Sequence, residues 1–567
     1  MTVEKLIVDH IDTWTTALQT RATAGRGSSG KIDLYGIKKL RELILELAVR
    51  GKLVPQDPND EPASVLLERI AAEKAELVKQ GKIKKPKPLP EISEEEKPFE
   101  LPEGWEWVRF GSIYEMEYGN NLPQEKRSNS GEYNVYGSNG IVGTHNEACI
   151  KSPCIVIGRK GSAGALNLSE QAACWVTDVA YSTIPPSAMN LEFVFVQFHT
   201  LGLDTLGKGI KPGLNRNDAY NLTIAIPPQS EQKAIVSKVN ELMSLCDQLE
   251  QHSLTSLDAH QQLVETLLTT LTNSQNADEL AKNWARISEH FDTLFTTEAS
   301  IDALKQTILQ LAVMGKLVPQ DPNDSSAEVL LEQLSTSRNK KLRQQQTDNK
   351  EAETMLRKIN KLKKAKPPFR LPNNWTTVHL IELCEYLVDC HNKTAPYTNT
   401  GIPIIRTTNI RERKFLEQDL KFISQETYDF WSKRCPPSPG DIIFTREAPM
   451  GEALIIPPNV KWCLGQRTML IRVMHEFVSN DFILLALTEP HLIERASENA
   501  VGLTVKHLRV GDVENLNIPL PPLNEQYKIV DKVNILFEYC NKLKSNIKAT
   551  QQTQLHLADA LTDAAIN

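Results

Sequence analysis

Two copies of the same ten residues, GKLVPQDPND, occupy positions 51–60 and 315–324 of this 567-residue chain. An exact repeat of this length does not arise by chance, so the chain carries an internal duplication. The similarity continues on both sides of the ten residues. Any fold of this chain must therefore build one local structure twice.

The repeated segment is predicted to be a helix, a turn and a second helix. Isoleucine and leucine recur at helical spacing before each copy, and Gly51 and Gly315 stand where a left-handed residue ends a helix. The prolines that follow predict a rigid turn. The last acid of each copy, Asp60 or Asp324, is expected to cap the second helix. Nothing in this segment resembles a catalytic motif, so we interpret it as a scaffold element.

Two further blocks recur in the same order. The segment FELPEGWEWV at 99–108 matches FRLPNNWTTV at 369–378, and each follows a linker rich in lysine and proline. Residues 214–250 match 508–544 in an aspartate, an Asn-Leu pair, a Pro-Pro pair and a Glu-Gln pair that opens a helix. The linkers predict boundaries between a helical scaffold and new domains.

The spacing between equivalent residues grows along the chain. Gly51 is matched by Gly315, the tryptophan at position 105 by that at 375, and the proline at position 227 by that at 521. The second copy is therefore longer chiefly between the LP..W and Pro-Pro blocks, and we find no convincing alignment there. In both inserts short β-type runs alternate with glycine turns, as in 154–166 and 440–456. We expect two unlike β-rich α/β domains in a duplicated frame.

The chain ends also match the middle of the chain. The stretch before Gly51 and the stretch after Pro521 are, taken together, about as long as the segment from Pro227 to Gly315. Near the start, DHIDTW resembles EHFDTL, which lies before the second copy. We therefore expect a circular arrangement, in which the N- and C-terminal helices meet, and an internal pseudo-twofold.

The helices that follow the Pro-Pro blocks have a heptad pattern, which favours long coiled-coil-like spacers packed antiparallel against the helices before the GKLV blocks. Ordinary bundle helices remain an alternative. The predicted seams are Ile235, Val239, Leu242, Cys246, Leu249, Leu263 and Leu267 in one helix, and Ile529, Val533, Leu536, Cys540, Leu543, Ile547, Leu557 and Leu561 in the other.

No motif in the chain carries a recognisable chemistry. GRGSSGKI at 25–32 nearly matches a phosphate-binding loop, but Ile32 stands where that loop needs a hydroxyl. HExxH and GxSxG motifs are absent from the sequence. The nine cysteines include no CxxC pair, which favours neither a zinc site nor a disulfide framework. The sequence therefore predicts a non-catalytic protein with no metal site.

Composition narrows the location and the partners. No window of about 18 uninterrupted apolar residues predicts a membrane span, and the first residues lack the layout of a signal peptide. Together with the cysteine usage, this predicts a cytoplasmic protein without membrane contact. The net charge is −7, and each insert is acidic. Affinity for nucleic acid would therefore need local patches or a partner protein.

Polar and basic residues near glycines or turns are the candidate binding residues, because arginine, lysine, asparagine and glutamine can contact phosphates and base edges. For any single residue, a solvated surface group or a satisfied turn is an equally good interpretation. The candidates in the first insert are Asn120, Asn121, Lys126, Arg127, Ser138, Asn139, Arg159, Lys160, Ser162, Lys208, Lys211, Asn215 and Arg216. Those in the second insert are Arg406, Thr407, Asn409, Arg411, Arg413, Lys414, Arg446, Gln466, Arg467, Lys506, His507 and Arg509.

The whole pattern resembles the specificity subunit of type I restriction-modification enzymes. The resemblance rests on the two LP..W domain starts, the loops YGSNGIVG and VIGRKGSAG, the segment GDIIFTREAPMGEALII and the paired PP…EQ..IV.KV helix starts. It implies an α+β chain with two target recognition domains, separated by long helical spacers. The implied segments are a helical scaffold at 1–98, recognition domains at 99–228 and 367–522, a spacer at 229–366 and a last helix at 523–567.

The resemblance also implies function and partners. Each recognition domain would read one half of a bipartite, asymmetric sequence in double-stranded DNA, while the spacers fix the gap. Two methyltransferase subunits and the restriction-translocase subunits would be partners, and S-adenosylmethionine, ATP and Mg would bind to those partners, not to this chain. The alternative is a scaffold or adaptor that joins two proteins through its coiled coil and binds no DNA.

Overall fold

The computed structural model describes residues 3–21, 31–81, 83, 88–128, 130–207, 213–347, 349–497 and 507–566. They form two compact units. Unit 1 comprises the described parts of Met1–Ala22, Gly30–Ser256 and Gln551–Asn567, and unit 2 comprises those of Leu257–Thr550. We call the β-rich parts of these units domain 1 (within 99–228) and domain 2 (within 367–522). Among the described residues, no helix is long and apolar enough to cross a membrane.

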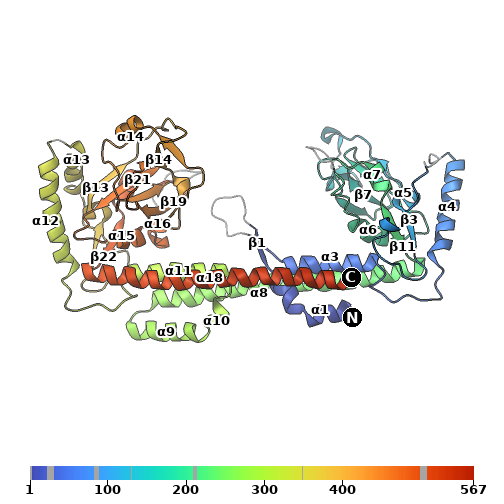
Figure 1. The fold of residues 1–567 in the computed structure, drawn as a ribbon, viewed down its shortest axis with the longest axis horizontal. Helices are drawn as coiled ribbons and strands as arrows, with labels where there is room; N and C mark the ends of the chain where they lie inside the picture. The colour runs from blue at the N-terminus through green and yellow to red at the C-terminus, as the bar shows by residue number, and fades with distance from the viewer. Residues whose placement is uncertain are drawn as a thin grey trace. The chain divides into compact units, whose positions relative to one another are not determined.

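Unit 1 combines a helical frame with domain 1 (Figure 1). Its helices are α1 (Val3–Asp9), α2 (Ile11–Thr16), α3 (Tyr35–Val49), α4 (Ala63–Lys79), α5 (Phe110–Ile113), α6 (Leu191–His199), α7 (Arg216–Tyr220), the first part of α8 (Gln229–Asn273) and the last part of α18 (Leu523–Ile566). Its strands are β1 (Gln19–Arg21), β2 (Lys31–Asp33), β3 (Glu106–Arg109), β4 (Glu117–Tyr118), β5 (Tyr133–Gly137), β6 (Gly140–His145), β7 (Cys154–Gly158), β8 (Leu166–Ser169), β9 (Trp175–Val176), β10 (Ala180–Thr183) and β11 (Thr223–Ile226).

Unit 2 repeats this plan with domain 2. Its helices are the rest of α8, α9 (Ala277–Glu289), α10 (Phe291–Leu294), α11 (Glu298–Val313), α12 (Ala327–Gln345), α13 (Lys350–Ile359), α14 (Gln425–Trp431), α15 (Asn480–Leu487), α16 (Pro490–Ser497), α17 (Val510–Glu514) and the first part of α18. Its strands are β12 (Thr376–His379), β13 (Cys384–Asp389), β14 (Ile402–Ile405), β15 (Ile410–Arg411), β16 (Lys414–Phe415), β17 (Lys421–Ile423), β18 (Ile442–Arg446), β19 (Met450–Ile455), β20 (Cys463–Leu464), β21 (Thr468–Val473) and β22 (Asn517–Leu520).

The two domains share the topology of two sheets and one strand pair, and domain 2 adds the pair β15–β16. In the described residues, an antiparallel sheet runs β4-β10-β7-β8 in domain 1 and β13-β21-β18-β19 in domain 2. A smaller sheet runs β6-β5-β9 or β17-β14-β20, with one parallel pair in each. A separate pair joins β3 to β11 and β12 to β22, which holds the two ends of each domain together. The expectation that the inserts are unlike is therefore wrong for their backbone, because strand pairing is kept while loop lengths and side chains diverge.

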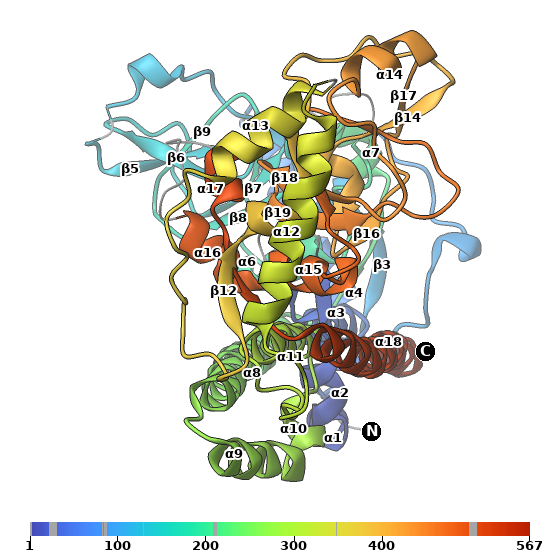
Figure 2. The same ribbon diagram turned by 90° about the vertical axis from the view of Figure 1, so that its left-hand side faces the viewer.

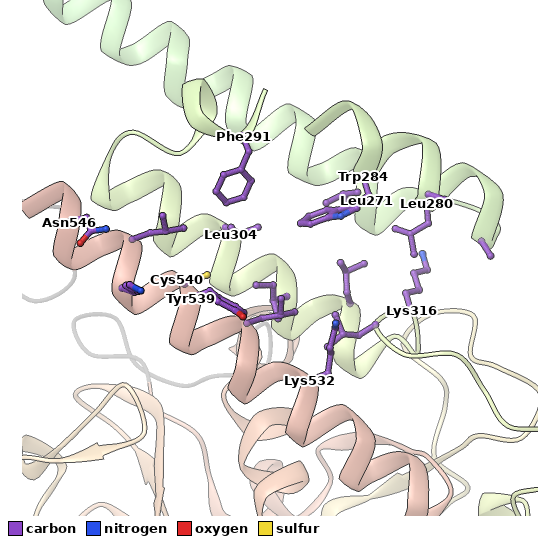
Figure 3. Close-up of a pocket in the computed structure, with 18 residues that line it drawn as sticks. Leu271, Leu280, Trp284, Phe291, Leu304, Lys316, Lys532, Tyr539, Cys540 and Asn546 are labelled. Carbon is purple, nitrogen blue, oxygen red and sulfur yellow. The ribbon is translucent and has the colours of Figure 1, made fainter. Parts of the chain in front are cut away.

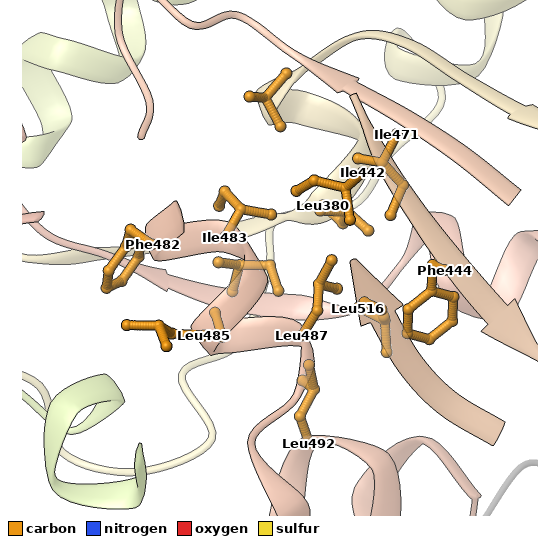
Figure 4. Packing of buried hydrophobic residues seen from close by; sticks show 14 of the residues in the cluster. Leu380, Ile442, Phe444, Ile471, Phe482, Ile483, Leu485, Leu487, Leu492 and Leu516 are labelled. Atoms are coloured by element: carbon orange, nitrogen blue, oxygen red, sulfur yellow. The ribbon is translucent and has the colours of Figure 1, made fainter. Parts of the chain in front are cut away.

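The core of domain 2 forms where its larger sheet meets α15. Ile442 and Phe444 of β18 and Ile471 of β21 are fully buried with Phe482 and Ile483 of α15 (Figure 4). Each such side chain contributes roughly 1.5–3 kcal/mol by leaving water. On the other side, α12 and α13 contact β13, which lies beside them in Figure 1. Figure 2 shows α12 and α13 in the foreground. The domain is thus packed on both faces of this sheet.

Three repeated motifs meet at one point in each unit, which we call the Trp–Glu–Gln junction. In unit 1 the Trp105 Nε1 donates to one oxygen of Glu231 at 2.8 Å, and the Gln56 Nε2 donates to the other at 3.1 Å. The same Gln56 amide also reaches the carbonyl of Gly51 at 2.7 Å. The junction therefore joins the GKLVPQDPND turn, the LP..W block and the first turn of α8.

Unit 2 builds the same junction with nearly the same geometry. Trp375 donates to Glu525 at 3.0 Å, and Gln320 donates to Glu525 at 3.1 Å and to the Gly315 carbonyl at 2.7 Å. The next residue of each helix start, Gln232 or Gln526, fixes the domain itself. Its side-chain oxygen accepts the backbone N–H that precedes α6 or α15, at 2.9 Å in both units. Every residue of the Glu-Gln pair thus has a structural role.

The prediction that Asp60 and Asp324 cap the second helix is wrong. The N-cap residues of α4 and α12 are Pro62 and Ser326, and neither makes a side-chain cap. Instead the first helical N–H of α4 donates to the Gly104 carbonyl at 2.8 Å, and that of α12 donates to an equivalent carbonyl at 2.9 Å. The LP..W turn, which is distant in sequence, supplies the cap that local residues were expected to provide.

The heptad prediction holds for the first half of each long helix and fails in the second. Leu263 is 51 % exposed and Leu557 is 44 % exposed, while the next residues, Val264 and Ala558, are buried. The buried Cys246 precedes Val264 by about five turns of a straight α-helix with roughly 3.6 residues per turn, and α18 repeats this spacing. Burial therefore follows the period of a bundle helix rather than the shorter repeat of a coiled coil.

The expected antiparallel partner is confirmed. In unit 2, Asp302 of α11 binds Lys544 of α18 at 2.6 Å, and Lys305 binds Asn541 at 2.6 Å, so the two helices run in opposite directions. Arg41 of α3 makes the equivalent contact in unit 1, with Asp247 of α8 at 2.6 Å.

The circular arrangement is also confirmed. Lys52 donates to the carbonyl of Ile566, near the end of α18, at 2.6 Å. The equivalent Lys316 donates to the carbonyl of Thr272, near the end of α8, also at 2.6 Å. The end of α18 therefore binds the GKLV turn of unit 1 through the same contact by which the end of α8 binds that of unit 2.

Replacing the glycine of the repeated motif is predicted to lower the unfolding free energy for two reasons, which are crowding and backbone conformation. Gly51 has φ of +66°, and a Cβ there would lie 2.4 Å from Pro102 Cγ. Gly81 has φ of +69° with open space around it. We expect Gly81→Ala to cost about 1–2 kcal/mol of unfolding free energy for the left-handed backbone. Gly51→Ala should cost a further 1–3 kcal/mol, roughly the cost of overpacking. Urea unfolding of the two variants measures this, and equal losses would contradict it.

The junction carboxylate predicts a pH-dependent effect. Burial raises the pKa of Glu231, while the hydrogen bonds from Gln56 and Trp105 act in the opposite direction. The folded chain therefore takes up a proton at Glu231 more readily than the unfolded chain does. Trp105→Phe removes a donor that serves the charged form, so it should cost about 1.5–3 kcal/mol at pH 7.5 and less at pH 5.0. Unfolding measurements at both pH values test this.

Trp14→Phe is the matched control for that measurement. Trp14 is fully buried, and its Nε1 donates to the backbone carbonyl of Leu6 at 3.5 Å, which does not titrate. The cost of this variant should be the same at both pH values. An equal pH dependence in both variants would show that the junction carboxylate is not responsible.

Candidate nucleic-acid interface

Domain 1 brings three candidate loops together at one end of its larger sheet. The β5–β6 hairpin has Ser138 and Asn139 at its tip, and β7 ends in the loop that carries Arg159 and Lys160. A Cβ on Gly158 would lie 2.5 Å from the Ser138 carbonyl oxygen, so the hairpin tip touches the loop. Lys160 forms a bridge to Gly213, and Leu214 N donates to the Arg159 carbonyl at 2.9 Å. The segment that begins with Gly213 thus lies beside the same loop.

Two arginines of this cluster share an aromatic partner. The guanidinium of Arg159 lies 5.0 Å from the ring centre of Tyr118, and that of Arg216 lies 4.9 Å from it. Tyr118 ends β4 and is 52 % exposed. Sequence reasoning missed Tyr118, because an isolated tyrosine beside two glutamates carries no signal of its own.

The remaining candidates of domain 1 divide into exposed and structurally engaged residues. Asn120, Asn121 and Lys126 are exposed. Arg127 donates to the carbonyl of Val142 at 3.2 Å and so braces the β5–β6 hairpin. The side chain of Asn215 accepts a hydrogen bond from Asn217 N and caps α7. Ser162 is half-buried, and its backbone closes the loop after β7 by accepting a hydrogen bond from Ala165 N at 3.3 Å. Lys208, Lys211 and the second-domain Lys506 lie outside the described residues.

Domain 2 gathers its candidates at the equivalent place. Leu508 N donates to the Arg446 carbonyl at 3.1 Å, as Leu214 does to Arg159, and His507 forms a bridge to Glu447. Here the loop arginine is neutralised, because Arg446 binds Asp389 at 2.9 Å and also donates to the carbonyl of Leu508. Arg467 is exposed, has φ of +68° and lies 3.2 Å from Glu447.

Several candidates of domain 2 have structural roles. Asn409 is fully buried, and its amide donates to the carbonyls of Leu416 and Gln418 at 3.0 Å each. Thr407 is buried and donates to the Ala448 carbonyl at 3.1 Å. Arg406 and Arg411 donate to backbone carbonyls of the same loop region. These side chains are engaged in holding the segment between β14 and β17, and Thr407 also holds it to the β18–β19 turn.

Two more candidates are placed by their contacts. The guanidinium of Arg413 lies 4.6 Å from the ring of Phe537 on α18, so it packs on the helical frame of unit 2. Gln466 donates to the Asn392 carbonyl at 3.2 Å and accepts from Thr394 at 3.1 Å. Lys414 and Arg509 are exposed.

Exposed apolar residues mark the hairpin of domain 1. Ile141 is 57 % exposed and Val142 is 44 % exposed, directly after the Ser138–Asn139 tip. The glycines at Gly137 and Gly140 keep this tip narrow. An apolar pair at an exposed hairpin tip can contact thymine methyl groups, which are the apolar feature of the major groove. Strand alternation could not have indicated this, because Ile141 and Val142 are consecutive and alternation places only one of two neighbours outward.

Among the residues that the structure describes, no group of three or more His, Cys, Asp or Glu side chains is placed to hold a metal ion. What the two domains present instead are polar and basic loops on a common sheet framework. The chain is thus a duplicated protein with two binding domains.

Comparison with known proteins identifies the family. The model of the type I restriction modification DNA specificity domain matches residues 102–259 and 372–551. The specificity subunits of the type I restriction enzymes EcoAI and EcoEI, both from Escherichia coli, are 45 % and 42 % identical, and each match covers 100 % of both chains. The chain belongs to the family of type I restriction-modification specificity subunits. It is a non-catalytic member of the restriction system.

A solved structure, described as the basis of complex assembly and conformational transition of the type I restriction-modification system, is also similar. Its identity to this chain is 18 % and the TM-score is 0.45, over 83 % of this chain and 99 % of that chain.

The structural role of Asn409 predicts a loss of stability. Asn409→Ala removes three hydrogen bonds of a fully buried side chain, two to the carbonyls of Leu416 and Gln418 and one from Arg406 N, so we expect a loss of about 2–4 kcal/mol in unfolding free energy. The nearby exposed Lys414→Ala should change it by less than about 0.5 kcal/mol. Urea unfolding of both variants tests the difference. If Asn409→Ala leaves the unfolding free energy unchanged, the structural role of Asn409 is contradicted.

Proposed function

We propose that this chain reads a bipartite, asymmetric sequence in double-stranded DNA, with one half-site for each domain. The observation that supports this most is the contrast between shared backbone and divergent loops. The two domains have one strand topology, yet the equivalent loop arginines meet Tyr118 in one domain and Asp389 in the other. A pair of readers that differ only in their loops suits a target whose two halves differ.

The helical frame suits a fixed gap between the half-sites. The helices α8 and α18 have 45 and 44 residues and contain no glycine or proline. At about 1.5 Å per residue, each has a length of roughly 66–68 Å. Helices of this length without a breaker are stiff, so the gap length would be a property of the frame and not of the domains.

We further propose that the frame binds methyltransferase subunits. In unit 2 a groove of about 720 Å³ lies between α9, α11 and α18, and Trp284, Leu304 and Tyr539 are among its lining residues (Figure 3). Trp284 is 41 % exposed and Tyr539 is 64 % exposed. Aromatic side chains of this kind anchor protein interfaces.

In unit 1 an ion pair joins the equivalent helices, α1 and α8. Lys238 of α8 binds Glu4 of α1 at 2.6 Å. The equivalent residues of unit 2 are Lys532 and Trp284, and both line the open groove. A partner with an acidic, partly apolar surface could fill this groove. Its carboxylate would form an ion pair with Lys532, like the pair that Glu4 forms with Lys238.

The partners account for the rest of the activity in this proposal. S-adenosylmethionine, ATP and Mg would bind to the methyltransferase and restriction-translocase subunits in the cytoplasm. Because the net charge of this chain is −7, the methyltransferase would supply part of the contacts to DNA phosphates.

A domain exchange tests the proposal. Residues 99–228 are replaced by the equivalent segment of another specificity subunit, and the methylated sites are mapped by single-molecule sequencing of host DNA. We expect one half-site to change, while the other half-site and the gap stay the same. An unchanged methylation pattern would contradict DNA reading by domain 1 and would favour an adaptor without DNA contact.

Trp284→Ala provides the opposite control. It removes the aromatic side chain from the groove and leaves both domains unaltered, so it should weaken co-purification with the methyltransferase without altering the recognised sequence. A change of sequence in this variant, or full retention of the methyltransferase, would contradict the role of the groove.

A further inference from the structure

Tyr118 organises two positive charges at the surface of domain 1. Arg159 comes from the loop after β7 and Arg216 from the start of α7, and both guanidinium groups lie over the Tyr118 ring within 5.0 Å of its centre. Guanidinium groups stack on aromatic faces, where they lose little hydration. One exposed ring thus holds two side chains that are far apart in sequence.

Neither arginine has an acidic partner in the described part of the chain. No ion pair there involves Arg159 or Arg216, and Arg216 makes a hydrogen bond only to the backbone carbonyl of Met116, at 3.2 Å. A negatively charged ligand beside Tyr118 would therefore meet two positive charges, and this attraction favours its binding.

The neighbouring tyrosine adds no negative charge. Tyr181 is buried, and its hydroxyl donates to the Leu214 carbonyl at 3.0 Å. Burial, together with Tyr118, raises the pKa of Tyr181 to about 12, although Arg159 and Arg216 act in the opposite direction. Tyr181 is thus a neutral phenol at physiological pH, and the cluster keeps its two positive charges.

The backbone that carries these side chains is fixed. Arg159 N donates to the Val179 carbonyl at 2.9 Å, and Leu214 N donates to the Arg159 carbonyl at 2.9 Å. Tyr118 pairs with Tyr181 across β4 and β10. The backbone at Arg159 and Tyr118 is therefore fixed, and the ring contacts keep both guanidinium groups near Tyr118 in the free chain, which lowers the entropic cost of binding.

Domain 2 provides an internal comparison, because it has the same framework with other side chains. Asp389 pairs with Met469 across β13 and β21, in the place where Tyr118 pairs with Tyr181. Arg446 takes the place of Arg159 and binds this Asp389 at 2.9 Å. The position equivalent to Arg216, at the start of α17, is an uncharged valine. Domain 2 therefore has one neutralised arginine where domain 1 has two unpaired ones.

We propose that Tyr118, Arg159 and Arg216 form a site for a DNA backbone phosphate, which domain 2 lacks at the equivalent place. Arg159 and Arg216 contact the phosphate oxygens, and Tyr118 is a positioning residue that keeps each guanidinium group within 5.0 Å of its ring centre. This rests on the proposed DNA-reading function. Arginine suits the role because its planar fork of N–H groups matches the oxygens of a phosphate. Contacts of this kind fix the register of a protein on DNA and carry no sequence information.

The salt dependence of binding tests the site. The full chain in complex with its methyltransferase is titrated with cognate and with unrelated DNA between about 50 and 300 mM salt. In the double variant Arg159→Gln/Arg216→Gln, the slope of log K against log salt should become shallower by about 0.9, since the site neutralises one phosphate and each neutralised phosphate contributes about 0.9. Affinity should fall equally for both DNAs, so the specificity ratio stays unchanged.

Three single variants separate positioning from charge. Tyr118→Phe keeps the ring and should keep the wild-type slope. Tyr118→Leu removes the ring without changing charge, and its slope should become shallower by part of the change seen in the double variant. Tyr118→Asp places the domain 2 residue beside Arg159, so its slope should be at least as shallow as that of Tyr118→Leu. Lys79→Ala, which removes an exposed positive charge from α4, is the control and should leave the slope unchanged.

Each other outcome overturns the site. An unchanged slope in the double variant excludes a phosphate contact, and a changed specificity ratio means that the arginines read bases. If the double variant no longer co-purifies with the methyltransferase but still binds DNA as the wild-type chain does, the ligand of the two arginines is a carboxylate of the partner protein. If the wild-type complex shows no preference for a bipartite sequence, DNA reading fails as the function. The slopes measured on unrelated DNA still decide whether the phosphate site exists.

Discussion

The rest of the structure depends on a buried carboxylate that holds three chain segments at one point. Glu231 in unit 1 and Glu525 in unit 2 each accept hydrogen bonds from a tryptophan and a glutamine that lie far away in sequence. A charged group in such a place is costly unless its oxygens are satisfied, so the three segments must arrive together. The junction thereby ties the start of a long helix to the start of a domain and to the turn before α4 or α12. What lies beyond it in each domain is free to diverge.

The sequence alone predicted the parts of the fold that depend on repetition and periodicity. The exact copies, the prolines and the helical spacing of isoleucine and leucine identified the frame, its antiparallel helices and the meeting of the chain ends. The shared topology of the two domains could not be predicted, because strand pairing requires only that side chains alternate between core and solvent. Two sequences can meet that requirement with almost no residue in common. The cap of α4 was also missed, since it comes from Gly104, which is remote from Ala63 in sequence.

The candidate site shows the same division. Glycine-rich loops indicated where the surface segments would lie, and Arg159, Lys160 and Arg216 are indeed brought together. Residue type could not show which polar groups are engaged inside the loops. Asn409 and Thr407 have the chemistry of base-reading residues, yet their hydrogen bonds are made to backbone carbonyls of their own domain. Conversely, Tyr118 matters through its place next to β10, which only the strand register shows.

The five-turn spacing of buried residues along α8 and α18 restricts how such a helix can change its length. One inserted residue would advance everything after it by about 1.5 Å and turn it by about 100°. The buried face would then point to solvent, and the junction at the helix start would no longer match the contacts near its end. An insertion of seven brings the face back to within about 20°, and only an insertion of five whole turns restores it fully. The helix can therefore be lengthened only by insertions that return the buried face to the same side.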